Sequence, residues 1–231
     1  MADTPSGDKP ASKGTVNEFH YFREQIYTCT GEDQIPNIYD QWAEKYNKHC
    51  VSVGYVGPAN LASVTSDIIS EKSARILDAA SGTGLVGEEL KKLGFSCIDA
   101  LDPSQGSIDQ SKTLDAYTNY ICDTLDEHRT QIQDDCYDAV VMCGAFGIPF
   151  HVTASCFPEL IRITKPGGYI MFTMSTKILE EWQDRVTAAI DYFIQQGMWE
   201  LKEMRWILYH VHDTISEKAK VTILRVKKNC T

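Results

Sequence analysis

The sequence lacks the marks of several protein classes. Lys and Arg number 22 against 32 Asp and Glu, so the formal charge of -10 repels nucleic acid and anionic lipid. The eight cysteines include no C-x-x-C pair and no close His partner, which argues against a zinc site and a dense disulfide framework. The first residues have neither the basic start nor the apolar core of a signal peptide, and no apolar run reaches the length of a membrane span. We therefore expect a cytoplasmic protein in a reducing compartment that binds neither nucleic acid nor a membrane.

A polar tail and a helical segment come first in the chain. Residues 1–15 hold Pro, Ser, Gly, Lys and Asp with almost nothing apolar, so we expect a disordered tail. From residue 16 to residue 70 the apolar residues follow helical spacing, and Pro36 stands where a first helical turn tolerates proline. We therefore expect one domain over residues 16–231, with a helical cap over residues 16–70 and a core over residues 71–231.

Short β-branched runs alternate with helical stretches in the predicted core. The predicted strands span residues 74–79, 96–101, 118–122, 137–143 and 169–174, and the predicted helices span residues 85–93, 107–114, 154–163 and 179–196. A turn at residues 166–168 precedes the fifth strand. Such alternation predicts an α/β fold with a parallel sheet covered on both faces. Residues 199–212 and 221–226 face each other across a polar stretch without a helix, which predicts an antiparallel hairpin at the sheet's edge.

A glycine-rich loop between the first predicted strand and the following helix carries the strongest local signal. Gly82, Gly84 and Gly87 fit the pattern G-x-G-x-x-G, and Asp102 stands 20 residues after Gly82. This spacing allows a nicotinamide or flavin dinucleotide site. The other candidate is an S-adenosylmethionine site, in which the glycines let the backbone approach the ligand and the acid after the second strand accepts from both ribose hydroxyls.

Three features favour S-adenosylmethionine. Asp78 lies just before the glycines, where a carboxylate opposes a pyrophosphate but suits a ligand that carries an ammonium and a sulfonium. About seventy residues precede the first predicted strand, whereas a dinucleotide-binding fold usually begins with that strand. The chain contains no Tyr-x-x-x-Lys pair and has little room for a separate substrate domain.

Several strings of residues resemble those of class I S-adenosylmethionine-dependent methyltransferases. They are Tyr39-Asp-Gln-Trp-Ala-Glu-Lys-Tyr46, Ile76-Leu-Asp-Ala-Ala-Ser-Gly-Thr-Gly-Leu-Val86, Leu101-Asp-Pro-Ser104, Tyr137-Asp-Ala-Val-Val, Gly144-Ala-Phe and Pro158-Glu-Leu-Ile-Arg-Ile-Thr-Lys-Pro-Gly-Gly168. Within that family the chain is most similar to the methyltransferase-like proteins of the Williams-Beuren syndrome chromosome region, from about Tyr39 to Met174. The resemblance implies a Rossmann-like, seven-stranded, mostly parallel sheet with an antiparallel C-terminal hairpin strand and an N-terminal helical cap.

The resemblance also implies a cofactor site. Its implied residues are Tyr39, Trp42, Tyr46, Asp78, Ala80, Ser81, Gly82, Gly84, Asp102, Pro103, Asp123, Thr124, Cys143 and Gly144. Asp78 is expected near the methionine ammonium, and Asp102 at the ribose hydroxyls unless it serves as a helix cap in competition with Ser104. Asp123 is expected at the adenine amino group with Thr124 beside it, or else as an exposed loop acid. Many members of the family carry Gly where Ala80 stands. The methyl group of an alanine at this position usually does not prevent the cofactor from binding.

Aromatic residues and histidines allow a functional and a structural interpretation. Tyr39, Trp42 and Tyr46 share one helical face, which is typical of a core helix, yet the family uses this helix as a lid where aromatic rings can lie near a sulfonium. We expect at least one of the three to pack only against protein. His151, after the fourth strand, resembles a His that some family members carry, so it is either the catalytic residue or a surface loop histidine.

Other candidates for chemistry are weaker. Cys143 is expected to be a packed thiol rather than a nucleophile. His210 and His212 alternate along a predicted edge strand, but two imidazoles without a third ligand predict no metal site.

These observations predict an enzyme that transfers a methyl group from S-adenosylmethionine to a small molecule, leaves S-adenosylhomocysteine as product, and acts as a monomer without a metal. Methyl transfer is an in-line displacement that needs an aligned nucleophile more than a base. A non-catalytic protein that binds either form of the cofactor is the alternative, followed by a nicotinamide-dependent dehydrogenase.

Overall fold

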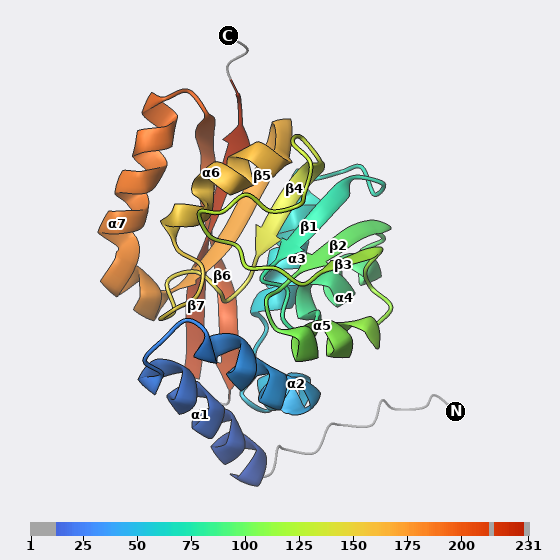
Figure 1. Cartoon of the computed structure of the whole chain (residues 1–231), viewed down its shortest axis with the longest axis vertical. Coiled ribbons are helices and arrows are strands. Elements are labelled where there is room, and N and C mark those ends of the chain that lie inside the picture. The colour runs from blue at the N-terminus through green and yellow to red at the C-terminus, as the bar shows by residue number, and fades with distance from the viewer. Residues whose placement is uncertain (1–12, 213–214, 229–231) are drawn as a thin grey trace.

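The computed structural model describes residues 13–212 and 215–228 (Figure 1). Three helices precede the first strand: α1 (Lys13–Thr28), α2 (Gln34–Ser52) and α3 (Gly57–Ile68). Strands and helices then alternate as β1 (Arg75–Ala79), α4 (Leu85–Lys92), β2 (Cys97–Leu101), α5 (Gln105–Lys112), β3 (Asn119–Ile121), β4 (Tyr137–Met142), the short helix η1 (Ala154–Cys156) with α6 (Phe157–Ile163), β5 (Thr164–Ser175) and α7 (Thr176–Gln195). The chain ends in the hairpin β6 (Trp199–His212) and β7 (Ile215–Val226).

The seven strands form one sheet in the order β3-β2-β1-β4-β5-β7-β6. The first five of these pair in parallel, whereas β7 is antiparallel to both β5 and β6. The predicted α/β fold with a mostly parallel sheet and an antiparallel C-terminal hairpin is confirmed. Within the hairpin, β7 lies inside the sheet and β6 forms its edge.

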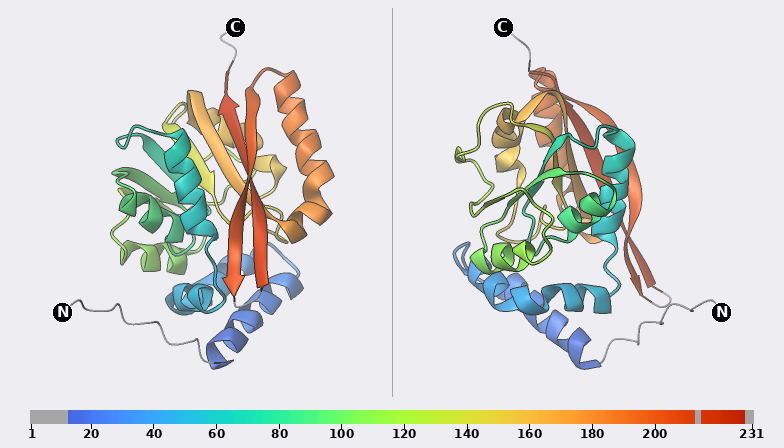
Figure 2. Two further views of the ribbon diagram at one scale, coloured as in Figure 1. Left: turned by 180° about the vertical axis from the view of Figure 1, so that it is seen from behind. Right: turned by 90° about the vertical axis from the view of Figure 1, so that its right-hand side faces the viewer.

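Alternate residues of the central strands feed two cores on opposite faces of the sheet. Leu77 and Val140 belong to a core that α6 and α7 cover, while Ile76 and Ala139 belong to a core covered by α3, α4 and α5. Figure 2 shows these helix layers on either side of the sheet. A third cluster joins α1 to α2, which lie together at one end of the sheet (Figure 1). Apart from Arg75, Asp78 and Asp138, the residues of the central strands β1 and β4 are apolar or aromatic, because both faces of these strands are covered.

The structure differs from the sequence-based expectations at four places. Residues 13–15 were expected in the tail but begin α1, and the rest of the expected tail lies outside the described residues. Helix α3 falls within the expected cap, yet its Leu61 and Ala62 pack on the sheet. The expected turn at residues 166–168 lies within β5, where the register shifts between Tyr137 and Ala139 of β4. The polar stretch before residue 221 is part of β7, because it pairs along β6.

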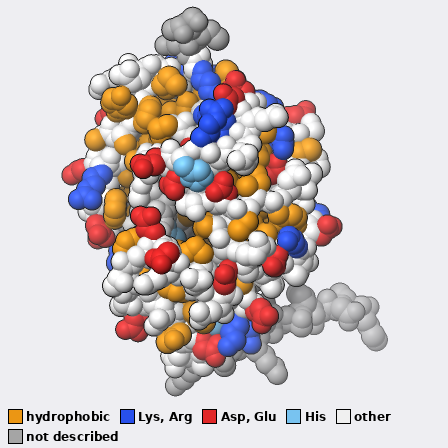
Figure 3. All heavy atoms as spheres, viewed as in Figure 1, with side chains coloured by type: hydrophobic (Ala, Val, Ile, Leu, Met, Phe, Trp, Pro, Cys, Tyr) orange, Lys and Arg blue, Asp and Glu red, His pale blue; other side chains and the backbone are white. Residues whose placement is uncertain are grey.

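The surface charges are mixed, and the cysteines form neither disulfides nor a metal site in the part of the chain that the structure describes. Figure 3 shows Asp and Glu side chains scattered over the face in view, with Lys and Arg between them. None of the helices that the structure describes has the length and hydrophobicity of a membrane span. The seven described cysteines are free thiols, and no metal-ligating cluster occurs within residues 13–212 and 215–228. His210 pairs with Glu217 instead, at 3.0 Å.

Candidate functional site

The glycine-rich loop turns the chain from β1 into α4. Ala80 and Gly82 both have φ of +53°, and Gly84 has φ of +96°, so the loop depends on the left-handed region. A Cβ built on Gly82 meets no atom within 4 Å, because this face of the loop is open. A Cβ on Gly87 comes within 2.2 Å of the Tyr117 ring. The glycines therefore have different tasks: Gly82 leaves room beside the loop, and Gly87 lets Tyr117 pack beneath it.

Two polar atoms under the loop have no hydrogen-bond partner among the described residues. Asp78 is 1% exposed, and its Oδ2 accepts from the Tyr117 hydroxyl at 2.6 Å, while its Oδ1 has no partner. The Ser81 hydroxyl is buried and likewise unpartnered. Burial raises the pKa of Asp78 to about 7, although the bond from Tyr117 opposes the shift. Buried polar groups are rarely left without partners, so both atoms point to a ligand.

Asp102 follows β2 and faces the loop. Its Oδ2 accepts from the Gly82 amide at 2.8 Å and its Oδ1 accepts from the Ser104 amide at 2.9 Å. Each oxygen keeps a lone pair for a further donor. Burial raises the pKa of Asp102 to about 6. Ser104, and not Asp102, caps α5, because its side chain accepts from the Ser107 amide.

A cavity of about 450 Å³ lies above the loop, within the size range of small-molecule sites. Helix α2 bounds it on one side, and the loops after β1, β2, β3 and β4 bound it at the carboxyl ends of the strands. Ligands commonly bind at this edge of an open α/β sheet. Ten of the predicted site residues line it: Tyr39, Tyr46, Ala80, Gly82, Asp102, Pro103, Thr124, Cys143, Gly144 and His151.

The other five predicted residues do not line this cavity. Asp78 and Ser81 lie beneath it. Gly84 is the residue before α4, and a Cβ there would lie 3.1 Å from the Tyr117 ring. Trp42 is 2% exposed and stacks on Phe22 of α1. Asp123 accepts from the Thr124 amide at 2.8 Å and lies 3.2 Å from an imidazole nitrogen of His128.

Sequence reasoning missed other residues on the cavity wall. They are Glu32, Asp33, Ile35, Pro36, Leu101, Leu125, Asp126, Ala145, Phe150, Val152, Thr153 and Ser155. Asp126 and Leu125 follow Thr124 in the loop after β3, so position after a strand was the one signal that could have identified them.

His151 and Tyr39 meet across the cavity, although they stand 112 residues apart in the chain. The Tyr39 hydroxyl lies 2.9 Å from His151 Nε2, and His151 Nδ1 lies 2.7 Å from the Pro149 carbonyl oxygen. Burial lowers the pKa of His151, so the neutral ring prevails near pH 7. Because a carbonyl oxygen only accepts, the hydrogen-bond network assigns the proton to Nδ1 and leaves Nε2 to accept from Tyr39.

Polar contacts join α2 to the loops. Asp40 Oδ1 accepts from the Ser104 hydroxyl at 2.6 Å and from the Gly106 amide at 2.8 Å. The Thr83 hydroxyl of the glycine-rich loop bonds to Asn47 Oδ1. These contacts hold the Tyr39 and Tyr46 face of α2 over the cavity.

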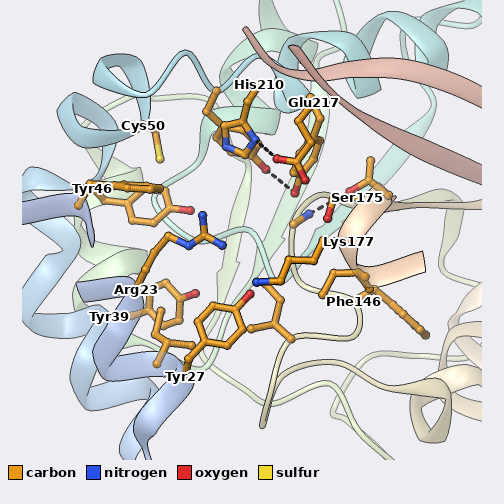
Figure 4. Close-up of a pocket in the computed structure, with 18 of the residues that line it drawn as sticks. Arg23, Tyr27, Tyr39, Tyr46, Cys50, Phe146, Ser175, Lys177, His210 and Glu217 are labelled. Atoms are coloured by element: carbon orange, nitrogen blue, oxygen red, sulfur yellow. Dashed lines mark hydrogen bonds and ion pairs between the residues drawn. The ribbon is translucent and has the colours of Figure 1, made fainter. Parts of the chain in front are cut away.

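A smaller cavity of about 110 Å³ adjoins the first (Figure 4). The two share Tyr39, Tyr46 and Gly144. Gly144 has φ of +76°, and a Cβ there would lie 2.7 Å from the Tyr55 hydroxyl, so only glycine fits. The Tyr55 hydroxyl also contacts the Cys143 thiol at 3.2 Å. Burial raises the pKa of Cys143 to about 12, which keeps it an uncharged, packed thiol.

Comparisons with known proteins agree with this architecture. A family model described as a methyltransferase domain matches residues 76–168. Human methyltransferase-like protein 27 is 31% identical over 203 residues, which cover 87% of this chain and 79% of the relative. Malonyl-[acyl-carrier protein] O-methyltransferase of Serratia marcescens is 27% identical over 118 residues, covering 50% of this chain and 44% of the relative.

Solved structures share the fold. A TehB-like S-adenosylmethionine-dependent methyltransferase from Corynebacterium glutamicum superimposes with a TM-score of 0.60 at 17% identity, covering 83% of this chain and 100% of the other. An S-adenosylmethionine-dependent methyltransferase from Thermotoga maritima gives 0.58 at 17% identity, covering 83% of this chain and 99% of the other.

Proposed function

The chain belongs to the class I S-adenosylmethionine-dependent methyltransferases, and from this premise we propose that it methylates a small molecule. Its cofactor is S-adenosylmethionine, which excludes the dinucleotide-dependent alternative.

The larger cavity has a donor and acceptor set that fits this cofactor. The unpartnered Asp78 Oδ1 and Ser81 hydroxyl would take the polar amino-acid end, and Asp102 has free lone pairs for the ribose hydroxyls. Gly82 leaves the approach open. When bound, the cofactor supplies a methyl group activated by a positively charged sulfonium. The adenine end would reach the loop after β3, where Thr124 lines the wall and Asp123 lies beside it.

Tyr39 and Tyr46 would cover the site and exclude water. Both rings line the boundary between the two cavities, where aromatic faces suit a nearby cation. Trp42 supports them from behind, with ring centroids 4.7 Å from Tyr46. His151 Nε2 is the atom that would take a proton from the acceptor, in place of the bond it now receives from Tyr39.

The single observation that carries the small-molecule proposal is the smaller cavity. It meets the larger one at Gly144, and residues of α1, α2, β5, α7 and the hairpin line it. Methyl transfer needs the acceptor in line with the transferred group, so a site that adjoins the cofactor cavity is the natural place for it. A volume of about 110 Å³ suits a small molecule better than a polymer.

The test is transfer of a radiolabelled methyl group into fractionated cell extract. Purified protein is incubated with labelled S-adenosylmethionine and either the dialysable small molecules, the proteins or the RNA of the extract. Label is expected in the small molecules with wild type and not with Asp102→Ala, which removes the ribose acceptor. Label confined to proteins or RNA would contradict the proposal.

A further inference from the structure

Two cations point into the smaller cavity of an otherwise acidic protein. Figure 4 shows the Arg23 guanidinium of α1 and the Lys177 ammonium of α7 directed into the same space from opposite sides. Arg23 is half-buried, whereas Lys177 is exposed at the rim. The protein as a whole carries a formal charge of -10. Two cations at one small cavity therefore form a local field of the opposite sign.

Neither cation lies at contact distance from a carboxylate of residues 13–212 or 215–228. Within the described part of the chain, the Arg23 guanidinium lies over the rings of Phe19, at 5.6 Å, and Tyr27, at 5.7 Å, and forms no ion pair. Lys177 lies 5.3 Å from the Tyr27 ring. Arg162, by contrast, forms an ion pair with a buried carboxylate, because its guanidinium lies 2.6 Å from Glu159. A half-buried guanidinium with only ring contacts keeps its donors available for a ligand.

The one carboxylate among the described residues of the wall already has a hydrogen-bond partner. Glu217 Oε2 lies 3.0 Å from Nδ1 of His210. That hydrogen bond, and to a lesser extent the charge of Arg23, lowers the pKa of Glu217. Glu217 therefore offsets one of the two cations from a distance, and an excess positive charge remains in the cavity.

The remaining wall is largely aromatic. Tyr39, Tyr46, Tyr55, Phe146 and Tyr209 contribute rings. Such a wall suits a flat apolar body. It also suits an organic cation, but Arg23 and Lys177 would repel one.

Resting on the proposed function, we infer that the methyl acceptor is a small, flat molecule with an anionic group that Arg23 and Lys177 bind together. The guanidinium fork matches a carboxylate or a phosphate, and the ammonium adds a point charge at the rim. The other end of the acceptor then faces Gly144, where the two cavities meet.

The test uses simple probes with the full chain saturated by S-adenosylhomocysteine. Benzoate, phenyl phosphate, neutral benzamide and cationic benzylamine are compared by calorimetric titration of wild type, Arg23→Gln and Lys177→Gln. Arg129→Gln is the matched control, because it removes the same charge from an exposed residue outside both cavities.

At least one anion is expected to bind wild type about tenfold more tightly than benzamide or benzylamine. Arg23→Gln should remove this preference, Lys177→Gln should reduce it, and Arg129→Gln should keep it. The relative affinity of the two anions identifies the group as a carboxylate or a phosphate.

Equal affinity for benzoate and benzamide, a preference for benzylamine, the absence of binding by both anions, or an unchanged preference in Arg23→Gln would overturn the inference. Binding of S-adenosylhomocysteine is measured first on each protein. Its absence from wild type would contradict the proposed function itself, whereas its retention with no anion preference contradicts the acceptor class alone.

Discussion

Replacing Asp78 with asparagine is expected to stabilise the unliganded protein at alkaline pH. The carboxylate is 1% exposed and, among the described residues, has one side-chain hydrogen-bond partner, the Tyr117 hydroxyl at 2.6 Å. Burial raises its pKa from 3.8 to about 7. The folded protein therefore binds a proton to Asp78 more tightly than the unfolded chain does.

The sign and size of the effect follow from linkage. A raised carboxyl pKa means that the contribution of Asp78 to stability is fully present below pH 4 and is lost as the pH rises through about 7. Between pH 5 and pH 8 the free energy of unfolding of wild type falls by about 3 kcal/mol through this group. Asparagine does not titrate, and its unpaired amide costs about 1–3 kcal/mol at every pH. Asp78→Asn should therefore gain about 3 kcal/mol on wild type between pH 5 and pH 8.

The measurement is urea denaturation at both pH values, followed by circular dichroism without ligand. Asp115→Asn is the matched control, because its side chain is 96% exposed, and its stability should follow wild type. A difference between Asp78→Asn and wild type that is the same at pH 5 and pH 8 would refute the reasoning.

The remaining predictions concern the ligand and the fold. Wild-type affinity for S-adenosylhomocysteine should rise roughly tenfold from pH 6 to pH 8, because Asp78 ionises over this range and then attracts the ammonium of the ligand. Calorimetry in which the affinity falls instead would exclude a contact between Asp78 and that ammonium. Asp102→Ala should weaken this binding by roughly 2–3 kcal/mol with unchanged circular dichroism, because the ribose hydroxyls lose a charged partner; an unchanged Kd would leave Asp102 a purely structural residue. Gly87→Ala should lower stability by about 1–3 kcal/mol in thermal unfolding, because its Cβ would overlap Tyr117, and a Tm equal to wild type would show that the ring moves freely. Amides of α2 should exchange more slowly with S-adenosylhomocysteine bound while those of β1 change little, and equal protection of α2 in both states would make this helix a fixed part of the core.

Local patterns predicted much of the core. The apolar runs of β1 and β4 and the helix between the glycine-rich loop and Gly94 are signalled by neighbouring residues, so the sequence alone revealed them. Asp102 was singled out by its place after the second predicted strand, 20 residues beyond Gly82.

Local patterns failed where backbone pairing overrides turn chemistry. Pro166 to Gly168 reads as a turn, yet β5 continues through these residues because β4 supplies partners on both sides of the register shift. The polar residues before Val221 pair with β6 for the same reason.

The sequence by itself determined the fold class, the cofactor and most of the segments that line the larger cavity. Only the tertiary structure decided which side chains share a cavity: Tyr39 meets His151 across 112 residues of chain, Trp42 turns toward α1, and Arg23, to which no sequence pattern assigned a role, points into the smaller cavity. Periodicity and turn residues report the conformation of a few neighbouring residues. Contacts between distant segments depend on how whole helices pack, and a short stretch of sequence carries no record of that packing.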